Sequence, residues 1–215
     1  MGRKKKLENQ AELIVDAAQE LFDRYGFAKT TLEDIAKAVG IGKATLYSDF
    51  TNKEEILMAV VQRNQAKALE QMRLVIENSS DGPLKTLQNV LLQDALFTFH
   101  NMKKHFQDPN PIHPPPYLRG RVMGQSFFHQ TLDEKAKLMA HLLDQAAAQG
   151  LILPLEDSLS QARMLRMALM SIKPPLMENR PDLALQPFLT TLIDMLLSGL
   201  KLPRNALERP CPPVN

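Results

Sequence analysis

The segment Gly42-Lys-Ala-Thr-Leu-Tyr47 carries side chains whose types suit contact with nucleic acid. A lysine donates to O6 and N7 of guanine, a threonine hydroxyl serves a base or a phosphate, and an alanine methyl contacts the thymine methyl group. Lys43, Ala44 and Thr45 therefore have the chemistry of base readers at the start of a helix lying in the major groove. The ring of Tyr47 can instead fill a core with its hydroxyl exposed.

Two short helices joined by a glycine-containing turn are predicted to position these side chains. Thr31 and Asp34 have the spacing of a capping box, which marks a helix start, and Gly40 marks the end of that helix. The turn 40–42 then separates it from a second helix over residues 43–48, which is the helix-turn-helix pattern. The apolar residues expected to form the core of this module are Leu32, Ile35, Ala36, Val39, Leu46 and Phe50.

Longer helices are predicted on either side of this module. Apolar residues at spacings of three and four between Ala11 and Tyr25 indicate a helix that Gly26 ends, with an acidic face opposite the apolar one. Asn52, followed by Glu55, marks the start of a helix that runs to about residue 77. Thr31 and Lys53 thus lie at helix starts, where backbone N–H groups favour a phosphate.

The run Gly26-Phe-Ala-Lys-Thr-Thr-Leu-Glu-Asp-Ile-Ala-Lys-Ala-Val-Gly-Ile-Gly-Lys-Ala-Thr-Leu-Tyr-Ser-Asp-Phe-Thr-Asn-Lys-Glu-Glu-Ile-Leu57 strongly resembles the DNA-binding domain of TetR-family transcriptional regulators. The family pattern places T-T-x-x-x-I-A-x-x-x-G across the second helix and K-x-x-L-Y-x-x-F-x-x-K-E-x-L from the third into the fourth. The resemblance implies that Tyr47 and Lys53 position phosphates, whereas Lys43, Ala44 and Thr45 read bases. Lys29 and Lys37 are DNA contacts or solvated charges.

Two positions depart from the family pattern. Gly42 stands where many members have a serine N-cap, and it leaves one more N–H for phosphate or water. Asp49 stands where the family often has an aromatic residue or a histidine touching the DNA backbone. An acid there would repel phosphate, so Asp49 is either turned away or weakens binding.

Positive charge is concentrated at the amino terminus, although the net charge of the chain is only +2. Arg3, Lys4, Lys5 and Lys6 form a basic arm, whereas residues 7–53 contain more acidic than basic side chains. Because sequence-independent affinity comes from phosphate neutralisation, this arm is expected to supply much of it, along or in the minor groove. The alternative is a flexible solubilising tail.

The remaining sequence predicts further helices and no strands, which makes the expected fold all-α with about nine helices. The expected segments are 84–106, 117–129, 132–149, 159–172 and 183–200. The domains are expected at 1–53 for DNA binding and 54–200 for ligand binding and dimerisation, with a proline-rich tail at 201–215.

The carboxy-terminal helices predict a ligand site and a dimer interface. Nine of the eleven methionines follow residue 70, and methionine adapts to varied ligands. Asp94 lies beside an apolar face, where it either serves as a cap or salt bridge to another helix or orients a polar or cationic ligand. The candidate ligand contacts are Asp94, Thr98, Phe99, Met102, His105, Met123 and Phe127. The last two helices are apolar around most of their circumference, which favours a homodimer over a monomer core; the candidate interface residues are Leu165, Leu169, Phe188, Leu192 and Leu196.

No catalytic motif, cofactor motif or metal-ligand spacing is present, so the sequence predicts a protein that is not an enzyme. Its single cysteine, Cys211, excludes an internal disulfide, and the absence of a secretory signal or membrane span favours the cytoplasm. The resemblance implies a homodimeric repressor that a small, largely apolar inducer releases from a palindromic operator on double-stranded DNA. The alternatives are a ligand-independent regulator of the same fold and a helical adaptor that does not bind DNA.

Overall fold

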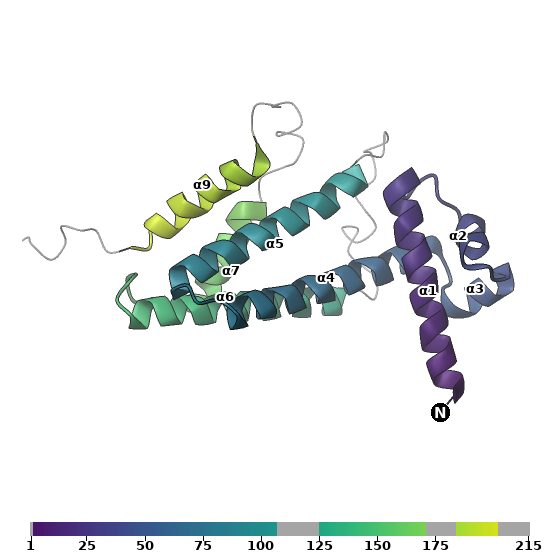
Figure 1. The fold of residues 1–215 in the computed structure, drawn as a ribbon, viewed down its shortest axis with the longest axis horizontal. Helices are drawn as coiled ribbons and strands as arrows, with labels where there is room; N and C mark the ends of the chain where they lie inside the picture. The colour runs from purple at the N-terminus through teal and green to yellow at the C-terminus, as the bar shows by residue number, and fades with distance from the viewer. Residues whose placement is uncertain (1, 107–124, 171–183, 202–215) are drawn as a thin grey trace, which may run out of the picture. The chain divides into compact units, whose positions relative to one another are not determined.

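The computed structural model describes residues 2–106, 125–170 and 184–201, which form eight helices and no strand. The all-α class predicted from the sequence is confirmed (Figure 1). The helices are α1 (Gly2–Tyr25), α2 (Leu32–Val39), α3 (Lys43–Asp49), α4 (Lys53–Glu77), α5 (Pro83–Phe106), α6 (Gln125–Ala148), α7 (Ser158–Met170) and α9 (Leu185–Ser198). Within these residues, no helix combines the length and apolar character needed to cross a bilayer.

The chain divides into two compact units, and the long helices α4 and α5 contribute to both. The first unit contains the described residues up to Glu70 and those from Phe99 to Leu132. Its core joins α1, α2, α3 and the first turns of α4 around fully buried side chains such as Ile14, Ile35 and Leu46. These three helices and the start of α4 are therefore one packed module.

The second unit contains residues 71–98 and the described residues from Asp133 onward. α7 packs against α9, and Gln88 of α5 donates to a carboxylate oxygen of Asp194 on α9 at 2.5 Å. The loop after α6 is tied to the end of α9, because the backbone N–H of Leu153 donates to the carbonyl of Leu200 at 3.0 Å. The second unit is thus a bundle to which α5, α6, α7 and α9 all contribute.

The helix ends follow local signals in the sequence. Thr31 and Asp34 form the predicted capping box, and Gly26, Gly40 and Gly150 follow their helices in the left-handed conformation, at φ +84°, +75° and +66°. Residues with a side chain would be strained there. Asn52 caps α4 as predicted, since the Glu55 backbone N–H donates to its Oδ1 at 2.8 Å.

Two expectations about helix limits differ from the structure. The break predicted between residues 129 and 132 is wrong, because α6 continues through Gln130 and Thr131, and no glycine or proline interrupts residues 125–148. Helix α1 begins at Gly2, earlier than the apolar pattern from Ala11 indicated, so the backbone of Arg3 to Lys6 is helical; the DNA role of these four residues stays a prediction. The predicted segment 117–124, the proline-rich stretch 108–116 and the tail after residue 201 lie outside the described residues.

Candidate functional site

Helix α3 presents the predicted base-reading side chains on its exposed surface. Lys43, Ala44 and Thr45 are all exposed, and Leu46 between them and Tyr47 is fully buried in the core of the first unit. The burial of Leu46 and Phe50 therefore fixes the rotation of α3 about its axis. Gly42 precedes the helix without any side-chain cap, which leaves its first backbone N–H groups open to a phosphate or water.

Tyr47 lies on the exposed side of α3 and is 48% exposed. Because nearly half of this residue reaches solvent, its ring does not serve mainly as core. The packing alternative raised by the sequence therefore has little support, and the hydroxyl remains a candidate phosphate contact.

The ammonium of Lys43 forms an ion pair with the carboxylate of Glu33 on α2. The hydrogen bond between them raises the pKa of Lys43 and lowers the pKa of Glu33. Both side chains are more than half exposed, so water screens the pair. Glu33 was missed as a functional candidate, because the sequence does not reveal which side chain of α2 lies beside α3.

Thr31 serves the start of α2 through its side chain. The backbone N–H of Asp34 donates to Thr31 Oγ1 at 3.2 Å, and the backbone N–H of Thr31 donates to Asp34 Oδ2 at 2.9 Å. The pKa of the Asp34 carboxyl is lowered first by the hydrogen bond from the Thr31 hydroxyl and then by the one from the Thr31 backbone N–H. The Thr31 hydroxyl also donates to Asp34 Oδ2, so a phosphate contact there would compete with the capping box.

Lys53 is the first residue of α4, and its ammonium points into the protein. Nζ donates to the backbone carbonyls of Phe27 and Thr30, at 2.7 Å each, and lies 4.4 Å from the centroid of the Phe27 ring. The phosphate role implied by the family resemblance therefore has to compete with strong internal contacts.

Helix α1 is connected to α3 and α4 through polar side chains. Gln10 donates to Asp49 Oδ2 at 2.5 Å, and Asp49 is half-buried. Both alternatives for Asp49, turned away from DNA or weakening its binding, stay predictions. Arg63 of α4 forms an ion pair with Asp16 and donates to Gln19 Oε1 at 2.6 Å. Part of the acidic face of α1 is thus an attachment site for α4.

Asp94, the candidate ligand contact on α5, is buried between two cations of the protein. Lys135 Nζ on α6 lies 2.9 Å from Oδ1, and Arg166 Nε on α7 lies 2.8 Å from Oδ2. Burial would raise the pKa of the Asp94 carboxyl, but Arg166 and Lys135 outweigh it and hold that pKa below its ordinary value. Burial lowers the pKa of the Lys135 ammonium despite its pairing. Of the two alternatives for Asp94, the structure contains the ion pair.

The sequence contained a signal for Lys135 and Arg166, the two partners of Asp94 that were not predicted. Lys135 lies on the apolar face of α6 next to Ala136 and four residues before Met139, and Arg166 lies between Ala162 and Leu169 on α7. A charged residue at a core position must be paired or hydrated. The rule that singled out Asp94 therefore applies equally to these two residues.

The other candidate ligand contacts are placed only in part. Phe99 is buried and Thr98 is half-buried, both on α5. Met102 and His105 lie on α5 and Phe127 on α6, where only the backbone is described, and Met123 lies outside the described residues. The described residues also contain no cluster of metal-binding side chains.

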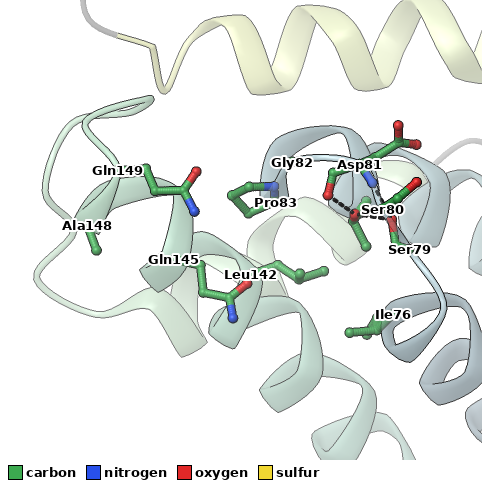
Figure 2. A pocket seen from close by; sticks show the side chains of 11 residues that line it. Ile76, Ser79, Ser80, Asp81, Gly82, Pro83, Leu142, Gln145, Ala148 and Gln149 are labelled. Atoms are coloured by element: carbon green, nitrogen blue, oxygen red, sulfur yellow. Dashed lines mark hydrogen bonds between the residues drawn. The ribbon is translucent and has the colours of Figure 1, made fainter.

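A surface depression of about 560 Å³ lies in the second unit, where the loop between α4 and α5 faces the carboxy-terminal end of α6 (Figure 2). Its lining includes Ser79, Ser80 and Asp81 from the loop, with Gln145 and Gln149 from α6. The hydroxyl groups of Ser79 and Thr86 are hydrogen-bonded to each other at 2.7 Å. The described candidates Asp94, Thr98 and Phe99 do not line this depression.

The candidate dimer residues differ in exposure. Leu165 and Leu169 of α7 are buried inside the chain, so they are unavailable to a second copy in this conformation, whereas Phe188, Leu192 and Leu196 of α9 are half-buried. The large exposed apolar side chains of this region are instead those of Met164 and Met167 on α7 and Met195 on α9. They were missed because the sequence did not indicate which side of each helix is covered.

The arrangement of α2, turn and α3, with an exposed basic start of α3 held by a separate core, defines a helix-turn-helix DNA-binding transcriptional regulator. The model of the family described as "Bacterial regulatory proteins, tetR family" matches residues 14–60. Residues 14–60 therefore form a DNA-binding domain of the TetR family, and the similarities support a TetR-family regulator.

Curated relatives support the assignment, although their alignments cover different shares of the chain. The uncharacterized HTH-type transcriptional regulator YhgD of Bacillus subtilis is 24% identical over 159 residues, which is 74% of this chain and 80% of YhgD. The IcaR negative regulator of the biofilm operon in Staphylococcus epidermidis is 49% identical over 49 residues, 23% of this chain and 26% of IcaR. The structure of FadR from Bacillus subtilis in complex with stearoyl-CoA has a TM-score of 0.65 at 19% identity, covering 87% of this chain and 98% of FadR. The last likeness concerns the fold alone.

Proposed function

We propose that this protein is a homodimeric repressor that binds a palindromic operator and releases it when a small, largely apolar inducer binds. The observation that carries the DNA-binding half is the exposed start of α3, where Lys43, Ala44 and Thr45 lie together on a helix oriented by the buried Leu46. Tyr47 and the basic residues 3–6 supply contacts to phosphates.

The same proposal assigns a separate function to each part of the chain. Residues 1–53 bind DNA, and residues 54–200 bind the inducer and form the dimer. Two exposed methionines on α7 and one on α9 support a second copy as the partner, since α7 and α9 already pack together. A twofold dimer presents two recognition helices to a palindromic site.

An apolar inducer is supported by two observations. The second unit contains many methionine and leucine side chains, and the FadR relative of the same fold was solved with stearoyl-CoA. Operator and inducer must then weaken each other's binding by the same factor, because linkage between two sites is reciprocal. A protein acting on DNA in this way works in the bacterial cytoplasm.

A footprint on the DNA upstream of the protein's own gene tests the proposal. We expect two protected half-sites related by a twofold axis, and loss of protection when fatty acids, acyl-CoA esters or other apolar compounds are added. A site without twofold symmetry would contradict the dimer. Protection that no compound removes, together with no thermal stabilisation by any of them, would favour a ligand-independent regulator.

A further inference from the structure

We propose that Lys53 is a positioning residue that attaches the start of α4 to the start of the helix-turn-helix, and that it makes no contact with DNA phosphate. The proposal rests on the DNA-binding function proposed above. It replaces the phosphate contact implied by the family resemblance with a role for Lys53 inside the protein. Its evidence is the set of contacts made by one ammonium group.

The ammonium of Lys53 is held by backbone oxygens of the turn between α1 and α2. Nζ lies 2.7 Å from the carbonyl oxygens of Phe27 and Thr30 and 3.5 Å from that of Ala28. The Phe27 ring covers another side of the group, with its centroid 4.4 Å from Nζ. An ammonium has three donors, so contacts with these oxygens leave little capacity for a phosphate.

The position of Lys53 in its helix explains why these oxygens are needed. Lys53 is the first residue of α4, where the helix dipole favours acids and disfavours a cation. Glu54 and Glu55 follow it in the first turn. The carbonyl oxygens and the aromatic face offset the unfavourable dipole and hold the side chain half-buried.

The hydrogen bond from Lys53 to the Thr30 carbonyl lies one peptide bond away from Thr31, where the helix-turn-helix starts. Thr30 is fully buried, its hydroxyl donates to the Gly26 carbonyl at 2.9 Å, and its own carbonyl accepts from Lys53. The next residue, Thr31, is the N-cap of α2. A rotation of α4 about its first turn must therefore carry α2 with it or break these hydrogen bonds.

Ten residues further along α4, the ion pair of Arg63 with Asp16 attaches the same helix to α1 a second time. Ten residues of α-helix span about 15 Å. Two attachments at this separation resist pivoting as well as sliding, so the first turns of α4 move with the DNA-binding module as one body.

Lys53→Met tests the proposal, because it removes the charge and keeps the length of the side chain. Hydrogen exchange of the amides at residues 26–31, measured on the full chain without DNA, should become faster. DNA affinity should fall about tenfold, which is a typical size for the coupling between two linked sites. Fluorescence anisotropy measures it on a mixed-sequence duplex and on the operator that the footprint identifies. The slope of log affinity against log salt should stay at the wild-type value.

A phosphate contact gives the opposite pattern. Removing one lowers the salt slope by about one and leaves the free protein unchanged. A slope lower by about one in Lys53→Met, or unchanged exchange at residues 26–31, overturns the proposal. Lys43→Met serves as the control, since it should weaken DNA binding without changing exchange in the turn.

Lys53→Arg separates charge from geometry if the methionine variant folds poorly. The planar guanidinium retains the charge but does not fit the oxygens that hold an ammonium, so exchange should again become faster while the salt slope stays unchanged. Wild-type exchange in this variant overturns the proposal. A wild-type protein that binds neither duplex would contradict the DNA-binding function, whereas the exchange measurement would still decide the role of Lys53.

Discussion

The Lys43 ammonium, at the start of the recognition helix α3, is paired with the Glu33 carboxylate on α2 in the absence of DNA. The carboxylate engages one of the three N–H donors of Lys43 and offsets part of the positive charge that Lys43 presents to DNA. We expect Glu33 to limit the affinity that α3 has for DNA.

Glu33→Gln should therefore raise DNA affinity severalfold and steepen its salt dependence, because Lys43 then carries its charge without an internal partner. Anisotropy titrations at several salt concentrations measure both effects. Glu12→Gln on α1 makes the same change in net charge at an exposed acid and is the control. Equal effects of the two substitutions would mean that only the global charge matters.

Tyr47→Phe should lower operator affinity by about two- to tenfold, the range for one lost hydrogen bond, and leave the melting temperature unchanged. The reason is that Tyr47 is 48% exposed, so the substitution removes a hydroxyl without opening a cavity. Tyr25→Phe on α1, at 51% exposed, is the matched control and should bind as the wild type does. A lower melting temperature for Tyr47→Phe would instead indicate a packing role.

Replacing Arg3, Lys4, Lys5 and Lys6 by glutamine should reduce the salt slope of DNA binding by up to about four, since each phosphate contact contributes about 0.9. Glutamine preserves helix propensity, which matters because α1 begins at Gly2. Glutamine at the exposed Lys67, Lys85, Lys137 and Lys201 removes the same charge and should leave the slope unchanged. An unchanged slope in the first variant would identify residues 3–6 as a solubilising segment.

Asp94→Asn should destabilise the protein by about 3–5 kcal/mol, because it leaves Lys135 and Arg166 buried without their counter-charge. Urea unfolding followed by circular dichroism measures the loss. Asp133→Asn breaks the half-exposed pair with Arg163 and should change stability by less than about 1 kcal/mol.

The same carboxyl predicts how stability responds to acid. The pKa of Asp94 is lower in the folded chain than its ordinary value, so the unfolded chain takes up the proton first as the pH falls. The stabilisation is complete above about pH 4–5 and is lost progressively below it. Asp94→Asn should therefore show a flatter decline of unfolding free energy between about pH 5 and 3; a decline equal to that of the wild type would assign the acid sensitivity to other carboxyls.

Met167→Lys should convert the proposed dimer to monomers without unfolding the chain, because Met167 is 71% exposed on α7 and its replacement puts a charge on the apolar surface. Analytical ultracentrifugation measures the mass. Leu13→Lys makes the same kind of change at a 51% exposed leucine of α1 and should leave the mass unchanged. A dimer that persists in Met167→Lys would place the interface elsewhere.

The sequence predicted those parts of the fold that depend on local signals. The capping box of Thr31 and Asp34 and the glycines at 26 and 40 each depend on a few neighbouring residues at one helix end, and all appear in the structure. The exposure of Lys43, Ala44 and Thr45 follows from the same helical periodicity, because Leu46 has to be buried.

Features that depend on contacts between distant residues could not be predicted. Lys53 and the carbonyl of Phe27 are 26 residues apart, and Asp94 and Arg166 are 72 apart, so no local pattern links them. The periodicity of α7 correctly indicated an apolar helix, but it could not tell that Leu165 and Leu169 face the interior of the chain while Met167 faces outward.

The three-helix ion cluster of Asp94, Lys135 and Arg166 also constrains how this sequence can change over evolution. Losing the carboxylate alone leaves two buried cations without a counter-charge. Losing either cation alone leaves the buried negative charge of Asp94 with only one partner. Simultaneous replacement by apolar residues of similar volume is the tolerated route, and such replacements are often neutral or stabilising. Across distant relatives, α5, α6 and α7 should therefore carry all three charged residues or none of them at these positions.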